Sequence, residues 1–261
     1  MLFRSFCGVK CSRPLAIEID GGRLHFTPQN NNTQFTDKIE LSFYGINEQA
    51  KAQPGIRSEV DLTLKPDTYQ RVSLVGMRMN PRITLPPGRY QLRVGVRETG
   101  GLFGTVFYDL QVPDFTKDPL MMSGLLITSA SAPVVPTPQA DPVVAKMLPA
   151  PATSRREFAQ SDSLAVLAEI YDNISSQQPR QIDTSVRLLA EDGREVFAAR
   201  DSLQNGSARN WNVYGYTRDI PLQNIGPGRY LLRVEAQVRG NRDGARPVES
   251  ETVLTVVGSG K

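Results

Sequence analysis

The sequence has few of the residues that usually carry catalysis and metal binding. It contains two cysteines, Cys7 and Cys11, and a single histidine, His25. A zinc site takes four ligands, so the two cysteines indicate a small disulfide or an incidental pair rather than a metal centre. A Ser–His–Asp triad would depend on His25, which lies in the strand-like stretch RLHF, and the chain has no G-x-S-x-G turn. The sequence therefore predicts no cofactor, no metal ion and no enzymatic activity.

Long hydrophobic runs and blocks of one charge are also missing. The longest apolar stretch, residues 120–130, is much shorter than the roughly 20 residues that cross a bilayer. The net charge is +3, and arginines alternate with acidic residues along the chain, which argues against a nucleic-acid partner. Residues 1–13 do not resemble a signal peptide and stay unassigned. We expect no transmembrane segment.

A repeated phrase is the main feature that the sequence does have. LPPGRYQLRV begins at Leu85, and IGPGRYLLRV begins at Ile225. Each copy alternates apolar and polar residues, which is typical of a half-buried strand, and a Pro-Gly pair supplies the turn before it. Tyr90 and Tyr230 occupy the place of the corner tyrosine of an immunoglobulin-like sandwich, so we predict a structural role for both.

Other stretches alternate with the same period, and helical patterns are scarce, with only the region near residue 145 arguable. Short strands with Gly, Pro and Asp between them favour antiparallel sandwiches. The predicted fold is all-β, with two tandem immunoglobulin-like antiparallel β-sandwiches joined by a proline-rich linker. The strand candidates beyond the repeat are residues 37–46, 59–65, 105–112, 164–171, 184–197 and 251–257.

The predicted domains follow from this pattern. Residues 14–117 form the first sandwich, for which we expect a truncated first strand, and residues 118–257 form the second. The proline-rich stretch at about 131–157 has no strand period and is either a linker or an excursion within the second domain. The apolar segment before it closes the first domain or supplies the first strand of the second, and we favour the second alternative.

One aromatic cluster suggests an alternative function. NWNVYGY places Trp211, Tyr214 and Tyr216 close together between asparagines. Exposed aromatic rings flanked by amides can stack on sugars, whereas the only tryptophan of a chain lies more often in a core. The alternative hypothesis is therefore a carbohydrate-binding module that uses this cluster.

Several phrases together resemble a known family. IDGGRLHF, FTDKIELSFYGIN and above all VPDFTKDPLMMSGLL resemble the C-terminal β-sandwich region of bacterial, acidobacterial-type proteins with a von Willebrand factor A-related domain. The resemblance covers residues 14 to 261. It implies that an export signal and a metal-binding A domain precede modules like these. The D-x-S-x-S metal motif is missing, because Asp183-Thr184-Ser185 is followed by valine, so no metal residue is carried over.

The expected function combines these points. We predict non-catalytic structural or protein-interaction modules from the C-terminal part of a secreted or envelope-associated adhesion-type protein. The expected partners are another protein or neighbouring domains of a longer chain, with a glycan as the alternative.

Overall fold

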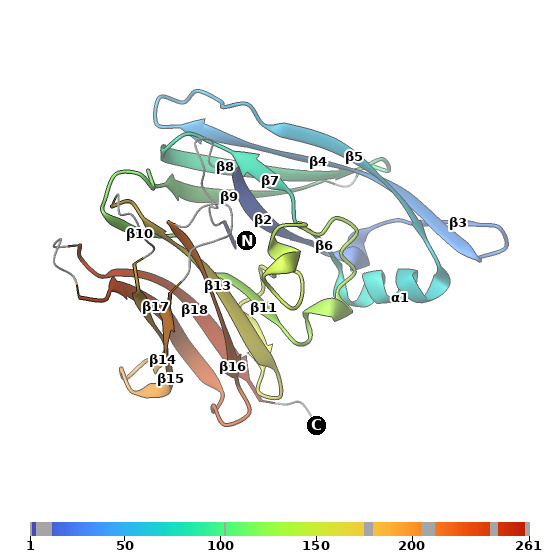
Figure 1. The fold of residues 1–261 in the computed structure, drawn as a ribbon. Coiled ribbons are helices and arrows are strands. Elements are labelled where there is room, and N and C mark those ends of the chain that lie inside the picture. The colour runs from blue at the N-terminus through green and yellow to red at the C-terminus, as the bar shows by residue number, and fades with distance from the viewer. Residues whose placement is uncertain are drawn as a thin grey trace. The chain divides into compact units, whose positions relative to one another are not determined.

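The described part of the chain folds mostly into β-strands (Figure 1). The computed structural model describes residues 2–3, 12–101, 103–174, 180–204, 212–240 and 245–258. The cysteine pair and Trp211 lie outside these residues, so the predictions made for them are not addressed by the fold. The described part of the chain confirms the all-β class, and its strands are antiparallel except for one parallel pair in the C-terminal half.

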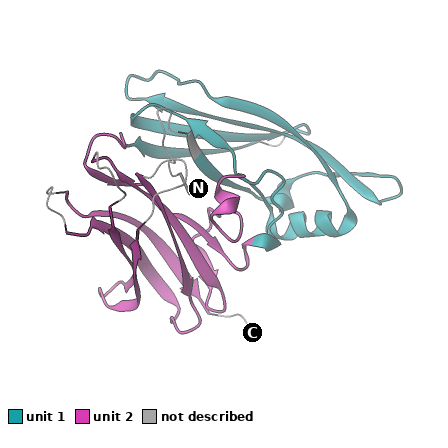
Figure 2. Cartoon of the chain, in the orientation of Figure 1, with its two compact units in different colours: residues 1–113, 133–141 teal, residues 114–132, 142–261 magenta. Residues whose placement is uncertain are grey.

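The chain divides into two compact units (Figure 2). Unit 1 consists of residues 1–113 and 133–141, and unit 2 of residues 114–132 and 142–261. Unit 2 thus begins at Asp114, where we predicted residue 118. The proline-rich stretch is not a simple linker, because residues 133–141 belong to unit 1 and the residues after them to unit 2.

The larger sheet of unit 1 has a long strand, β4, near its middle. β4 pairs with β5 over residues 35–43 and with β8 over residues 39–47, and β8 pairs on its other side with β9. The faces agree with the predicted alternation, since Ile39, Leu41 and Phe43 are buried. The strands of this sheet are β3 (Thr27–Gln29), β4 (Gln34–Asn47), β5 (Ile56–Leu64), β8 (Gly88–Glu98) and β9 (Phe103–Val112).

The smaller sheet of unit 1 is built on β2, which pairs with β1, β6 and β7. β6 and β7 form one interrupted strand, because Pro81 between them has no N–H to donate to a ladder. Both sheets contribute to one core, in which Leu15 and Met79 pack with Leu41 and Leu92. The strands are β1 (Leu2–Phe3), β2 (Ser12–Ile19), β6 (Met77–Met79) and β7 (Arg82–Thr84).

Residues 133–141 complete unit 1 along β6. The backbone N–H of Arg78 donates to the carbonyl of Pro136 at 2.8 Å, and the N–H of Asn80 donates to that of Gln139 at 2.9 Å. The buried carboxylate of Asp141 lies 2.7 Å from the Nε atom of Arg82. The segment therefore satisfies backbone and charged groups that a buried strand cannot leave unpaired.

A helix that the sequence reading missed follows β5. α1 (Pro66–Val75) begins with a proline at a position where its missing N–H costs nothing, and Asp67 lies in its first turn. Only Val72 of this helix is buried, so its apolar stripe is too narrow to stand out in the sequence. The region near residue 145 forms only a single 3-10 turn, η3 (Val144–Lys146). Two further 3-10 turns are η1 (Gly21–Arg23) and η2 (Ala132–Val134).

Unit 2 also places two sheets around one core. In the four-stranded sheet β13 pairs with β10 and β11 and, on its other side, with β16. The segment before the proline-rich stretch thus supplies strands to the second unit, as we favoured. These strands are β10 (Leu120–Met122), β11 (Leu126–Ser129), β13 (Ser163–Asp172) and β16 (Val213–Pro221).

The five-stranded sheet of unit 2 has the order β12-β18-β17-β14-β15. The predicted Asp192-Gly193 hairpin joins β14 to β15, with Gly193 at a φ of 82°. Val166 and Tyr216 of the first sheet pack with Val186 and Leu232 of the second. The strands are β12 (Glu157–Ala159), β14 (Ile182–Ala190), β15 (Glu195–Leu203), β17 (Gly228–Val238) and β18 (Val248–Val257).

Candidate functional site

The repeated phrase forms the same local structure in both units. Tyr90 and Tyr230 are buried, and each hydroxyl donates to the carbonyl four residues earlier, at 3.0 Å to Pro86 and 2.6 Å to Gly226. This bond from a strand back to the turn before it is the geometry of a tyrosine corner. Both residues thus have a structural environment in which the hydroxyl is bonded to the turn.

The aromatic cluster proposed for sugar binding is not exposed. Tyr214 and Tyr216 on β16 are each only 1% exposed. Their hydroxyls donate to the carbonyl of Arg180 at 2.6 Å and to the carboxylate of Asp201 at 3.0 Å, and burial raises the pKa of both phenols. The prediction of a stacking platform is therefore wrong for these two tyrosines, whose inward parity on the strand places them in the core.

His25 pairs with a buried carboxylate. Its ring Nδ1 lies 3.0 Å from Oε2 of Glu98, and its backbone N–H donates to Oε1 of the same side chain. Burial alone would raise the pKa of Glu98, but the hydrogen bonds from His25 outweigh it and lower the pKa. Burial and the neighbouring Glu98 raise the pKa of Asp37. Glu98 thus holds His25 through both its ring and its backbone.

The described residues also contain no group of three His, Cys, Asp or Glu side chains that could hold a metal ion. Their helices include none that is long and apolar enough to cross a membrane.

The outstanding surface feature of unit 1 is β9. Four of the nine large exposed apolar side chains among the described residues lie in this strand, namely Phe103, Val106, Phe107 and Tyr108. The register with β8 places Val106 and Tyr108 on the side of the core and the two phenylalanines on the opposite side. Leu110 and Val112 lie on the same side as Val106 and Tyr108, and only Leu110 and Val112 are buried. The first half of β9 is thus apolar and exposed on both faces.

β9 also has an unpaired side. Among the described strands it pairs with β8 alone, so its other long side presents backbone groups that no described strand binds. We call this side of Phe103–Val112 the β9 edge. Unpaired strand edges are templates for the addition of another strand.

Arginines line the outer face of the neighbouring strand. Arg89, Arg93 and Arg97 alternate outward along β8, and Arg93 and Arg97 lie directly opposite Phe107 and Phe103. The ring of Phe103 leans over Gly95, whose missing side chain would lie 3.5 Å from that ring. Arg89 and Arg97 form no ion pair with any described residue. Exposed aromatic rings beside arginines are the residue types that dominate protein–protein binding energy.

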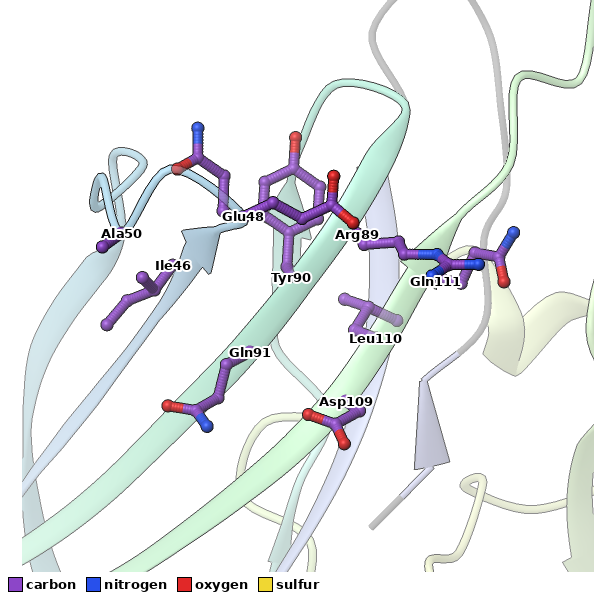
Figure 3. A pocket seen from close by; sticks show the side chains of 10 residues that line it. Ile46, Glu48, Ala50, Arg89, Tyr90, Gln91, Asp109, Leu110 and Gln111 are labelled. Carbon is purple, nitrogen blue, oxygen red and sulfur yellow. The ribbon is translucent and has the colours of Figure 1, made fainter.

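A shallow groove continues this face toward the corner tyrosine. Its volume is about 600 Å³, and Figure 3 shows its walls on β4, β8, β9 and the turn after β4. The charged groups include Glu48, Arg89 and Asp109, and the described lining contains no serine, cysteine, histidine or lysine. The groove presents both positive and negative charge, and its two carboxylates, Glu48 and Asp109, are exposed. Its lining is Ile46, Asn47, Glu48, Ala50, Arg89, Tyr90, Gln91, Asp109, Leu110 and Gln111.

A second groove, in unit 2, has its charges already paired. It has a volume of about 680 Å³ and lies over β14, β15 and β17. Arg239 donates to both carboxylate oxygens of Asp183, and this pairing lowers the pKa of Asp183. Glu235 likewise accepts from Arg187. Since these groups neutralise one another, the groove is a weaker candidate than β9.

Comparisons with known proteins give little beyond this geometry. No family model and no curated protein matches the chain. Among solved structures it is similar to dimeric latent PorU from Porphyromonas gingivalis, with 13% identity and a TM-score of 0.31 over 96% of this chain and 18% of that one. It is also similar to a beta-glucuronidase from Bacteroides uniformis, with 11% identity and a TM-score of 0.31 over 94% of this chain and 26% of that one. The chain spans about a quarter or less of these proteins, and this likeness assigns no function.

The exposed half of β9 is the part of the site that sequence reasoning overlooked. A signal for it exists, because FGTVFY carries large apolar residues at both odd and even positions. A strand with one face in solvent would have polar residues at either its odd or its even positions.

Proposed function

We propose that this chain is a non-catalytic protein-interaction module that binds an extended segment of a protein partner at the β9 edge. The observation that carries the proposal is that the first half of β9 is exposed on both faces and that no described strand pairs with β9 along one side. An added strand matches all three surfaces at once. Its backbone pairs with the edge, and its alternating side chains cover the apolar residues on each face.

The chemistry of the surface supports a protein over a glycan. A sugar would stack on one face of the sheet and would leave the backbone groups of the edge and the inward side chain of Val106 uncovered. The two tyrosines proposed for sugar binding are buried in unit 2. A partner strand that buries one phenylalanine side chain gains about 1.5–3 kcal/mol from that contact.

The absence of enzymatic activity is part of the same proposal. His25 is held by Glu98, and the described lining of the groove beside β9 contains no serine, cysteine, histidine or lysine. Neither feature supports acyl, phosphoryl or metal-assisted chemistry.

The setting that we propose comes from the sequence resemblance alone. The resemblance supports an interaction module in the C-terminal part of an exported, envelope-associated protein of the adhesion type. The partner of this module is a separate protein or a neighbouring domain. An antibody raised against residues 14–261 tests this on fractionated source cells. A band in the envelope or medium supports the setting, and a band confined to the cytoplasm overturns it.

Strand addition is tested with a synthetic peptide. We would immobilise a short peptide of alternating threonine and valine with lysine at both ends, and a matched peptide with proline at its centre. The full chain should bind the first and not the second, because proline removes a donor and breaks the ladder. Equal binding to both peptides, or to neither, would overturn the proposal.

Variants of the chain locate the binding on β9. Phe107→Ser should weaken binding of the threonine–valine peptide at least about tenfold, because it removes an apolar contact from the outer face. Leu74→Ser is the matched control, since Leu74 is an exposed apolar residue of the same unit on α1. An equal loss in both variants would mean that the peptide binds elsewhere or without specificity.

A further inference from the structure

We infer that the strand added at the β9 edge is the β9 strand of a second copy of this chain, paired antiparallel about a two-fold axis at Thr105. The inference rests on the proposed function, because it names the partner of the same site. It follows from two features of the β9 edge. The edge lacks the residues that usually prevent association, and its side chains complement those of the same strand in a second copy.

β9 lacks the features that keep other strand edges apart. Its ten residues contain one charged side chain, Asp109, and no proline or lysine. Its pairing with β8 runs from Val112 to Phe103 without a bulge. Natural edges avoid association through charges, prolines, bulges or short length. β9 is long and regular and has almost none of these.

Two other strands of the chain show the contrast. β5, on the far side of β4 from β8, exposes the charged residues Arg57, Glu59 and Asp61. β15, at the end of the five-stranded sheet of unit 2, carries Glu195, Arg200 and Asp201. Each of these two strands carries three charged side chains, whereas β9 carries one.

The residues of β9 complement one another in one register. An axis at Thr105 places Phe103 of each copy opposite Phe107 of the other, with the two threonines face to face at the centre. Aromatic pairs and threonine pairs are both favourable across antiparallel strands. Asp109 then lies beyond Phe103–Phe107, the stretch of β9 that the two copies share, so the two carboxylates do not meet.

Other two-fold registers match less well. An axis at Val106 places Phe103 opposite Asp109, and an axis at Phe107 places Phe103 opposite Gln111 and Thr105 opposite Asp109. An axis at Asp109 brings the two carboxylates together, which is unfavourable. The register on Thr105 is the one that pairs both phenylalanines.

The same register brings opposite charges closer. Arg97 lies opposite Phe103 on β8 and has no ion pair with a described residue. With strands ~4.8 Å apart and a rise of ~3.4 Å per residue, Asp109 lies two strands across and two residues along from Arg97 of the other copy, a Cα separation of ~12 Å. An arginine and an aspartate side chain can together span this distance on one face of a sheet.

Disulfide trapping tests the register in the full chain. In a Cys7→Ser/Cys11→Ser background, Thr105→Cys should form a disulfide-linked dimer under mild oxidation, because residues opposite each other lie about 4.5–5.5 Å apart, within the range that a disulfide bridges. Thr63→Cys is the matched control on the charged β5 edge, where Thr63 is also exposed. Equal dimer formation in both variants would indicate random collision and overturn the inference. Preferential trapping by Val106→Cys would overturn the register.

Sedimentation velocity over a range of concentrations tests the association itself. The Cys7→Ser/Cys11→Ser chain should dimerise reversibly, and Val106→Lys should weaken the dimer at least about tenfold by placing a charge at the edge. Val253→Lys is the matched control, since Val253 is similarly exposed on β18. Circular dichroism checks that each variant is folded.

The two proposals fail in different ways. A chain that stays monomeric while it still binds the threonine–valine peptide overturns the second copy and leaves the interaction module standing. A chain that neither dimerises nor binds the peptide overturns both.

Discussion

Arg93 lies over the ring of Phe107, with its guanidinium carbon 5.1 Å from the ring centroid. The two residues are opposite each other on β8 and β9, so the contact follows directly from the register of the sheet. An exposed cation–π contact contributes about 0.5–1 kcal/mol. Arg93 covers one face of the ring. Phe107 nevertheless stays 61% exposed, so most of its side chain is available to a partner.

Replacing Phe107 should affect binding and not folding. Phe107→Ala removes a mostly exposed side chain, and we expect the free energy of unfolding to change by less than about 1 kcal/mol. Phe43→Ala, in the core of the same sheet, should cost about 3–5 kcal/mol because it leaves a cavity. Urea unfolding of both variants checks the contrast. A large loss in Phe107→Ala would show that this ring stabilises the unit rather than serving a partner.

The two corner tyrosines should contribute alike. Tyr90→Phe and Tyr230→Phe each remove one hydroxyl that donates to a turn carbonyl. We expect each variant to lose about 1 kcal/mol, and the double variant to lose the sum, because the two bonds share no partner. Thermal and urea unfolding measure the losses. Destabilisation by only one of the variants would contradict the equivalence of the two turns.

The His25–Glu98–Asp37 group predicts opposite responses to acid. The folded pKa of Glu98 lies below its ordinary value of 4.5, so its stabilisation is present above pH 4.5 and is lost as the pH falls through the folded pKa. The folded pKa of Asp37 lies above 3.8, so ionised Asp37 destabilises the fold near neutral pH.

Two variants separate these effects. Asp37→Asn should raise stability near neutral pH by less than about 1 kcal/mol, because the site is partly open to solvent. Glu98→Gln should flatten the loss of stability between about pH 5 and pH 3. Urea midpoints measured across this range check both. A stabilising effect of Asp37→Asn that is larger below pH 4 than at pH 7 would contradict the assignment.

The proline-rich segment should be needed for the stability of unit 1. Asp141→Ala leaves the partly buried Arg82 without this carboxylate, and we expect a loss of about 1–3 kcal/mol. Asp61→Ala, on the exposed face of β5, should change stability by less than about 0.5 kcal/mol. Hydrogen exchange of the β6 amides reports whether the loss is local to the strand that residues 136–139 cover. Equal effects of the two variants would show that the segment merely rests on the surface.

Much of the fold could be predicted because strand alternation reflects burial directly. The apolar faces at Leu41, Val94 and Leu232 follow the period of two, and the repeated Pro-Gly turns mark where strands begin. α1 was missed because it buries only Val72, so its 3.6-residue period is weak. Which unit the proline-rich residues join depends on distant strands such as β6, and no local pattern encodes that.

The candidate site was harder to predict for the same reason. Alternation places Tyr108 and Tyr216 on inward faces, yet one is 40% exposed and the other is in the core. The difference depends on whether a second sheet covers that part of the strand, which is a property of the whole unit. Exposure of β9 could have been suspected only from the phenylalanines at its outward positions.

The path of residues 133–141 also bears on how such a protein can change over generations. Each unit takes its residues from two separate stretches of the gene, so a recombination event that exchanges residues 114–261 as one block would remove the segment that pairs with β6. The incoming block would have to bring an equivalent segment with it. An exchange that keeps unit 1 intact therefore has to keep residues 133–141 with residues 1–113, although each unit has a core of its own.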